Sequence, residues 1–340
     1  MMTKVLLLIL VVLTLGCTGS QEPASPPIQA SENCMGFVIG APMEATTIPL
    51  AGGAWARPHP GPFAWQWIEN EKGVFFFDFA DRWVHMAQDS NVAILGTIWP
   101  YADWDQETCR EDSCVVTGRD QFCADNRFDY IGGKLPNWRC APCDTDDYKN
   151  FVRTVVERYD GDGVDDMPGL LLPIKHWEIS NEPEMQGEDL TFFIGRPEEY
   201  VEILKGGYEA VKEACPDCTV VQGGAAGSED TQAFWGEVFD LGGGDYFDIA
   251  NIHFINYGDA VTLNVKGFKV LMDEKGVDKP IWVTEAEFPS NDDVLASTQG
   301  ALDAGASKIF FTRFEIGRWG PPEPGKYSEV YEKVPSMCKI

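Results

Sequence analysis

Two short apolar runs of the sequence each end in a glutamate, and these two acids are the residues best placed to do chemistry. The first run, PIKHWEISNEP, spans residues 173–183 and carries Glu182, and the second, KPIWVTEAEF, spans residues 279–288 and carries Glu285. A charge in a buried strand is costly unless it lies at the strand's end and has a role there. Two carboxyl groups at neighbouring strand ends can hydrolyse a glycosidic bond, because one protonates the departing oxygen while the other attacks the anomeric carbon.

The elements that must position these acids are apolar runs alternating with amphipathic stretches. The runs that read as strands cover residues 36–40, 53–58, 92–99, 173–180, 219–224, 247–254, 280–285 and 308–314, and helical patterns cover 79–90, 148–159, 198–214 and 295–306. Apolar strands alternating with helices indicate a parallel sheet covered by helices. Eight such strands predict an α/β fold of the (β/α)₈ TIM barrel type rather than an open sheet. No Gly-rich phosphate loop follows the first strand, which disfavours a dinucleotide-binding fold.

Composition limits the partners of the chain. With 340 residues, 44% of them hydrophobic, one principal domain is expected. The formal net charge of −28 argues against nucleic acid as a partner, because phosphates would be repelled. Neutral glycans fit better, and the alternative is that the charge serves only to keep an exported protein in solution.

The amino terminus reads as an export signal followed by a tether. Residues 1–17 form an apolar stretch that ends in small residues around Cys17. The run LTLGC resembles the lipobox of prokaryotic lipoproteins, in which the cysteine is lipidated, and ordinary cleavage with release is the alternative. Residues 18–33 are polar and rich in Pro and Ser, which predicts a flexible tether. We therefore expect an extracellular catalytic domain over residues 34–340, lipid-anchored to the outer face of the cell membrane.

A cysteine-rich insertion, residues 102–147, interrupts the repeat after the third strand. It contains five of the ten cysteines, namely Cys109, Cys114, Cys123, Cys140 and Cys143. A loop this long needs staples to be ordered, and disulfides are the expected ones in an oxidising compartment. Zinc is the alternative, because Cys140 and Cys143 have ligand spacing. The nearby pair Cys215 and Cys218 is expected to be a structural staple rather than a redox motif.

The segments around the two acids resemble glycoside hydrolase clan A, the retaining β-glycosidases built on TIM barrels, and the resemblance covers the chain from residue 34 onward. In that clan an Asn-Glu-Pro triplet closes strand four, with the glutamate as general acid/base, and a second glutamate closes strand seven as nucleophile. Here these positions are Asn181, Glu182 and Glu285. The resemblance implies double displacement on a β-linked glycan, through a covalent glycosyl-enzyme on Glu285.

Three further substrate-binding candidates follow from the same resemblance. Arg57 stands where many clan members have an arginine that hydrogen-bonds the nucleophile, and His253 matches a strand-six histidine. Trp319 corresponds to a tryptophan that forms the floor of the sugar subsite. The segment at 63–82 also resembles the clan, with Asn70 where proline is common.

Physical chemistry sets requirements for the two acids independently of the family. Glu182 must be protonated to act as an acid, so an apolar or negatively charged environment should raise its pKa. Glu285 must be ionised, and Arg57 should lower its pKa. Glu287 has the same strand parity as Glu285 and could face the same side, while Glu178 is expected to be a buried structural acid beneath Glu182.

An acidic loop precedes the fourth strand. Its carboxylates, Asp160, Asp162, Asp165 and Asp166, are the hard oxygen ligands that calcium takes. The loop departs from the EF-hand pattern because Val164 stands where a third ligand is required. A solvated acidic turn and a structural calcium ion therefore both remain open, and no other cofactor is implied.

The sequence thus predicts an exported retaining glycoside hydrolase. The alternative is a non-catalytic, carbohydrate-binding lipoprotein on the same barrel. A metal-dependent hydrolase would need histidines clustered at strand ends, and the sequence offers no such cluster.

Overall fold

The strands form a nearly closed parallel barrel. The computed structural model describes residues 33–110, 114–116, 135–136, 138–186, 191–255, 257–288, 293–312 and 331–338. The strands are β1 (Met35–Ile39), β2 (Trp55–Pro58), β3 (Ala93–Ile98), β4 (His176–Asn181), β5 (Thr219–Gly224), β6 (Ala250–Ile255), β7 (Ile281–Glu287) and β8 (Ala306–Phe311). Their order is β5-β4-β3-β2-β1-β8-β7-β6, and parallel bridges Val221↔Ile249 and Ala225↔Ile252 join β5 to β6. The predicted (β/α)₈ TIM barrel is confirmed. The first and last residues of each predicted strand differ from the observed ones by at most three positions.

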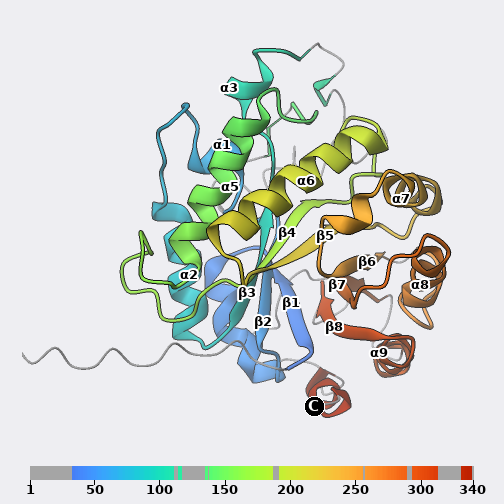
Figure 1. The fold of residues 1–340 in the computed structure, drawn as a ribbon. Helices are drawn as coiled ribbons and strands as arrows, with labels where there is room; N and C mark the ends of the chain where they lie inside the picture. Colours follow the sequence, from blue (N-terminus) through green and yellow to red (C-terminus); the bar gives the residue numbers. More distant parts are fainter. Residues whose placement is uncertain are drawn as a thin grey trace, which may run out of the picture.

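Helices surround this barrel (Figure 1). The longer ones are α2 (Asp78–Asp89), α5 (Thr145–Tyr159), α6 (Pro197–Ala214), α7 (Thr231–Asp240), α8 (Val265–Glu274) and α9 (Val294–Asp303). Short elements are α1 (Trp65–Ile68), α3 (Asp103–Gln106) and the 3₁₀ helices η1 (Pro42–Ala51), η4 (Gly243–Asp245) and η5 (Tyr331–Met337). The four predicted helices correspond to α2, α5, α6 and α9. Within the described ranges no helix combines the length and apolar character needed to cross a membrane.

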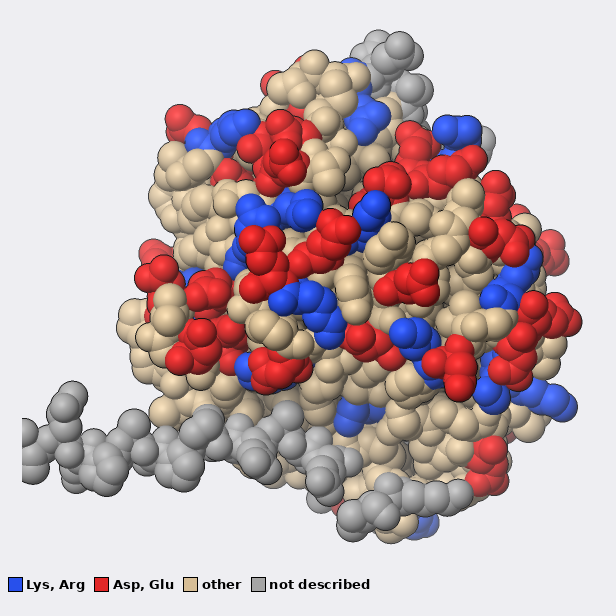
Figure 2. Space-filling model, viewed as in Figure 1, with Lys and Arg blue, Asp and Glu red and all other residues tan. Residues whose placement is uncertain are grey.

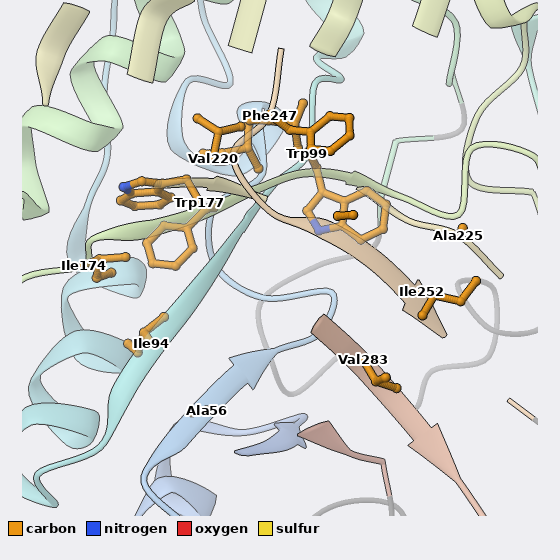
Figure 3. Close-up of a cluster of buried hydrophobic side chains, with 14 of the residues drawn as sticks. Ala56, Ile94, Trp99, Ile174, Trp177, Val220, Ala225, Phe247, Ile252 and Val283 are labelled. Carbon is orange, nitrogen blue, oxygen red and sulfur yellow. The ribbon is translucent and has the colours of Figure 1, made fainter. Parts of the chain in front are cut away.

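Each strand separates two hydrophobic layers, because successive side chains point to opposite faces. The outer faces pack under the helices, and Figure 3 shows part of this layer, including Ala56, Ile94, Trp177, Val220, Ile252 and Val283. The barrel interior has its own smaller cluster, which includes Val38, Trp55, Leu95, Val221, Trp282 and Phe310. Most of them, including Trp55, Leu95, Val221 and Trp282, lie in the N-terminal halves of their strands, whereas Val38 and Phe310 lie nearer the C-terminal ends. Buried polar side chains, among them Arg57, Asn181 and His253, occupy much of the C-terminal end of the interior.

Disulfides rather than zinc hold the described cysteines. Within the insertion after β3, Cys109 is bonded to Cys143 and Cys114 to Cys140. Cys215 is bonded to Cys218, which confirms the predicted staple, and Cys34 is bonded to Cys338. Of the ten cysteines in the sequence, the other two, Cys17 and Cys123, lie outside the described residues.

Acidic and basic side chains are mixed on the face that α5 and α6 present (Figure 2). Lys149 pairs with Glu209 at 2.8 Å, and Arg153 pairs with Glu213 at 3.0 Å. Both pairs join α5 to α6 on the exposed side, where an ion pair contributes at most about 1 kcal/mol. On this face the acidic excess of the chain is dispersed rather than gathered in one patch.

Candidate active site

Five of the predicted site residues meet at the C-terminal ends of β2, β4, β6 and β7. They are Arg57, Asn181, Glu182, His253 and Glu285, with exposed fractions of 0, 0, 2, 0 and 5%. In a TIM barrel this is the end at which active sites are built. The sixth, Trp319, lies outside the described residues.

The backbone leaves strand geometry at Glu182. Asn181 pairs with Gly224 of β5, and the Glu182 N–H still donates to the Gly224 carbonyl at 2.9 Å. The φ angle of Glu182 is nevertheless +39°, a left-handed value uncommon for a residue with a side chain. Such strain is found where the surrounding structure fixes a functional group, and here it coincides with the acid candidate.

A bulge in β7 places the side chains of two consecutive residues, Thr284 and Glu285, next to His253. Ile252 pairs with Val283 and His253 pairs with Glu285, so Thr284 is an extra residue on β7. Thr284 Oγ1 lies 2.8 Å from His253 Nε2, and Glu285 Oε1 lies 3.8 Å from His253 Nδ1. Bulges next to active sites redirect side chains in this way. Parity alone could not separate Glu285 from Glu287, which is half-buried at the end of the strand.

Arg57 links β4 and β7, the two strands at whose ends Glu182 and Glu285 lie. Its Nη1 donates to Glu285 Oε1 at 2.7 Å, and its Nε donates to Glu178 Oε2 at 2.7 Å. Its Nη2 donates to Asn181 Oδ1 at 2.6 Å. Glu178 is the buried acid that strand parity predicted, and it also accepts from Thr97 at 2.6 Å. Arg57 therefore fixes the nucleophile candidate and the asparagine beside the acid candidate together.

Two polar groups that contact this arginine, Asn181 and His59, complete the site. The Nδ2 of Asn181 is buried and has no hydrogen-bond partner among the described residues. His59 accepts from Arg57 Nη1 through Nδ1 at 3.3 Å, and this nitrogen lies 3.9 Å from Glu285 Oε1. Burial, followed by Arg57 and His253, lowers the pKa of His59 well below its ordinary value, so the ring is neutral.

The two glutamates are close together in different surroundings. One oxygen of Glu182 and one of Glu285 lie within 4.8 Å of each other. Burial raises the pKa of Glu182 to about 8, with Glu178 adding to the rise and Arg57 opposing it. Burial also raises the pKa of Glu285, while His253 and Arg57 lower it. Arg57 thus acts on Glu285 in the expected direction, although desolvation outweighs it.

The chain matches no protein-family model and no curated protein sequence, whereas its fold matches many solved structures. The fold resembles that of the clan A glycosidases. A glucosidase from Croceicoccus marinus superposes with a TM-score of 0.61 at 15% identity, covering 93% of this chain and 69% of that one. A monomeric β-xylosidase from Caulobacter crescentus CB15 gives 0.61 at 13% identity, covering 92% and 69%. An endo-1,4-β-mannanase from Rhizomucor miehei gives 0.53 at 15% identity, covering 90% and 94%.

The donor atoms of Glu182, His253 and Glu285 lie close enough to surround a cation, all within 4.8 Å of one another. Their surroundings do not fit one, because the Arg57 guanidinium already contacts Glu285 at 2.7 Å. A divalent ion would have to share a buried carboxylate with that fixed positive charge. The arrangement fits acid–base and nucleophilic chemistry better.

The predicted calcium loop lies at the opposite end of the barrel, between α5 and β4. Oxygens of Asp160, Asp162 and Asp166 are within 4.8 Å of one another, and Asp165 is not part of this group. Backbone N–H groups of Gly161 and Gly163 donate to the Asp166 carboxylate at 2.9 and 2.8 Å. These contacts account for a solvated acidic turn, and calcium stays a prediction.

Sequence reasoning missed three polar residues of the site. Asn251 lies two residues before His253, so strand alternation could have placed both on the same face. Thr284 is brought in by the bulge, for which the sequence carries no local signal. Glu184 accepts from the Ala226 N–H at 2.7 Å and from Thr231 at 2.8 Å, and burial raises its pKa to about 7.

Proposed function

We propose that this protein is a retaining glycoside hydrolase that cleaves β-linked glycans by double displacement. The observation that carries the proposal is the pair Glu182 and Glu285, with oxygens within 4.8 Å at the ends of β4 and β7. Retaining enzymes hold their two carboxyl groups about 5–5.5 Å apart, and inverting enzymes hold them about 6.5–9.5 Å apart to admit a water. The shorter separation supports retention.

In the first step Glu285 is the nucleophile. Its carboxylate attacks the anomeric carbon, and Glu182 gives its proton to the glycosidic oxygen as the bond to the leaving group breaks. A pKa near 8 keeps Glu182 protonated at neutral pH, as this step requires. Arg57 holds the Glu285 carboxylate by an ion pair at 2.7 Å and favours its charged form.

In the second step Glu182, now a carboxylate, removes a proton from water. The water oxygen attacks the anomeric carbon as this proton is transferred, and the bond between that carbon and Glu285 breaks, which restores both groups. The Nδ2 of Asn181, which has no partner in the described part of the chain, can donate to the sugar 2-hydroxyl, a contact that strengthens in the oxocarbenium-like transition state. Trp319 is proposed as the floor of the sugar subsite.

The glycan class is a narrower proposal. The solved structures of similar fold include proteins described as a glucosidase, a β-xylosidase and an endo-1,4-β-mannanase. We therefore propose β-glucans, xylans and mannans as the first substrates to test. Their neutral chains suit a protein of net charge −28.

Export is proposed from the amino-terminal sequence together with the disulfides. Four described disulfides are typical of proteins that fold in an oxidising compartment. Residues 1–17 are proposed as the export signal, Cys17 as the lipidated residue and 18–33 as the tether. Incorporation of a labelled fatty acid that is lost in Cys17→Ser is expected, and equal labelling of both proteins would contradict the anchor.

The test is sugar release from β-glucans, xylans, mannans and the matching aryl β-glycosides. Glu182→Gln and Glu285→Gln are compared with wild type and with Glu287→Gln, a matched change two residues further along β7. We expect one polymer to be cleaved, with a loss of about 10²–10⁴-fold in Glu182→Gln and at least as much in Glu285→Gln. Glu287→Gln should keep wild-type activity.

The outcomes separate the rival functions. Loss in both folded variants, with the control active, supports the proposed mechanism. Binding of a glycan without any release would favour the non-catalytic, carbohydrate-binding alternative. Loss in Glu287→Gln with activity kept in Glu285→Gln would show that the nucleophile had been assigned to the wrong glutamate.

A further inference from the structure

A chain of hydrogen bonds links Asn251 to the acid Glu182 through Thr284 and His253. Asn251 and His253 lie on β6, and Thr284 is the bulged residue of β7. All four side chains are nearly inaccessible to solvent. The double displacement described above gives no role to Asn251, Thr284 or His253. The direction of each hydrogen bond that joins them nevertheless follows from the chemistry of the atoms.

The direction is set first at the Asn251 amide. Its Nδ2 lies 2.6 Å from Glu178 Oε1 and 3.3 Å from the Gln222 carbonyl, and both of these atoms are acceptors. The amide nitrogen must therefore point toward them. Its Oδ1 then faces Thr284 and accepts from the Thr284 N–H at 3.3 Å.

The proton position on the Thr284 hydroxyl in turn determines which nitrogen of His253 carries a proton. Its Oγ1 lies 2.9 Å from Asn251 Oδ1 and 3.2 Å from Glu178 Oε1, two acceptor oxygens. Donation of the single hydroxyl proton to His253 Nε2 would leave both oxygen contacts without a proton, whereas donation to one of the oxygens leaves only one such contact, so the proton is placed toward an oxygen. Only a lone pair of Oγ1 remains for His253 Nε2 at 2.8 Å. The proton of the neutral imidazole is therefore on Nε2, which leaves Nδ1 as an acceptor.

The bare Nδ1 faces Glu182 Oε1 at 2.7 Å. Two acceptors at this distance would repel each other unless a proton lay between them, and with a neutral ring that proton belongs to Glu182. The ring is neutral because burial lowers the pKa of His253 to about 4. Burial also raises the pKa of Glu182 to about 8, in agreement with a protonated acid.

We propose that Asn251 and Thr284 are positioning residues that hold His253 in the Nε2–H tautomer, so that His253 keeps Glu182 protonated as the general acid. The catalytic half of this inference rests on the proposed function, and the hydrogen-bond assignment does not. Gly224 makes room for the ring, since a Cβ atom there would lie 1.9 Å from His253 Nε2.

Other ionisable groups surround the pair and must be kept unchanged in any test. Those that face Glu182 or His253 from neighbouring elements are Arg57, His59, Glu178, Glu184 and Glu285. Thr284→Val leaves all of them in place and replaces the hydroxyl by a methyl group, with little change of shape. Thr284→Ser keeps the hydroxyl and is the matched control.

The first measurement is ¹⁵N–¹H NMR of the histidine side chains at pH 7, which reports the protonated nitrogen without any substrate. The chain has four histidines, and His253→Gln identifies the resonances of His253. We expect Nε2–H in wild type and in Thr284→Ser, and a shift toward Nδ1–H in Thr284→Val. A wild-type ring protonated on Nδ1, or on both nitrogens, would overturn the proposal.

The second measurement is the pH dependence of kcat/KM, which reports the free enzyme's acid. In Thr284→Val, Nδ1–H would donate to the Glu182 carboxylate and favour it, so the basic limb should move down by about one pH unit. Thr284→Ser should keep the wild-type limb. If wild type, Thr284→Val and Thr284→Ser had the same pH profile and the same His253 tautomer, a positioning role would be contradicted. If wild-type His253 carried its proton on Nε2 but the protein cleaved no glycan, only the proposed function would be refuted.

Discussion

The two ends of the barrel interior handle buried charge in opposite ways, although the same strands line both. At the C-terminal end, Arg57 lies 2.7 Å from oxygens of both Glu178 and Glu285. At the N-terminal end, Lys308 of β8 lies 4.1 Å from the ring centroid of Trp55 and donates to the Asn33 carbonyl at 2.8 Å. One end therefore balances its cation with carboxylates, and the other holds its cation with aromatic faces.

The difference separates the part of the barrel that holds the candidate active site from the part that stabilises the fold. Trp55 and Arg57 are two residues apart on β2, and Trp282 precedes Glu285 by three residues on β7. Trp282 stacks on His176 with ring centroids 5.1 Å apart and lies 5.7 Å from Trp55. Packing of this kind stabilises the fold, whereas buried ion pairs contribute little net stability and fix geometry instead.

Arg57→Met should show the largest effect and tests the charged end. The change leaves Glu178 and Glu285 buried without their cation, so we expect a loss of about 3–5 kcal/mol in the free energy of unfolding. Activity should fall as well, because Glu285 is no longer held or kept ionised. Denaturant unfolding and sugar release measure the two losses.

A second change serves as the control for Arg57→Met. Adding Glu178→Leu removes one uncompensated carboxyl group, so part of the stability should return while activity does not. An Arg57→Met protein as stable as wild type would show that the ion pairs are not the feature that distinguishes the C-terminal end.

Trp282→Ala tests the aromatic end. Removing a buried tryptophan destabilises a protein by about 3–5 kcal/mol through lost contacts and the cavity that remains. At temperatures where the variant is folded, we expect kcat/KM close to the wild-type value, because the changed side chain is three residues from Glu285 and at the other end of the interior. A large fall in kcat/KM for fully folded protein would contradict the division between the two ends.

Lys308→Met should have the smallest effect at neutral pH. It loses contacts with Trp55 and Asn33 but also removes a buried charge, so we expect a change of no more than about 1 kcal/mol. Unfolding midpoints at pH 7 measure it, and activity should be unchanged.

The pH dependence of stability sharpens the same prediction. Burial lowers the pKa of Lys308 to about 7, whereas a lysine in an unfolded chain has a pKa of about 10.4. Between these values the unfolded state binds more protons, so wild-type stability should gain a rising contribution from pH 7 to pH 10. Lys308→Met should lack this contribution, and an identical slope in both proteins would show that the lysine is not desolvated.

Much of the fold could be predicted because its signals are local. Apolar runs ending in Glu182 and Glu285 mark the ends of β4 and β7, and parity correctly placed Glu178 in the interior. The pairing of Arg57 with Glu285 was expected from a family resemblance, since nothing local connects residues 228 positions apart.

Other features depend on contacts between strands and could not be predicted. The bulge at Thr284 arises from the register of β7 against β6, and it overrides the two-residue alternation on which sequence reasoning relies. The tautomer of His253 depends in turn on that bulge. The place of Lys308 between Trp55 and Trp282 follows from barrel closure, which brings β8 beside β1 and near β2.

The central claim is that Glu285 is the nucleophile, and capture of the glycosyl-enzyme tests it most directly. The protein is incubated with a 2-deoxy-2-fluoro β-glycoside of the sugar it releases, which slows the second step, and the intact mass and the labelled peptide are then measured. We expect one added glycosyl group, carried by Glu285 and absent from Glu285→Gln. A label on Glu182 or Glu287, or an active enzyme that forms no adduct and releases a sugar of inverted configuration, would contradict the claim.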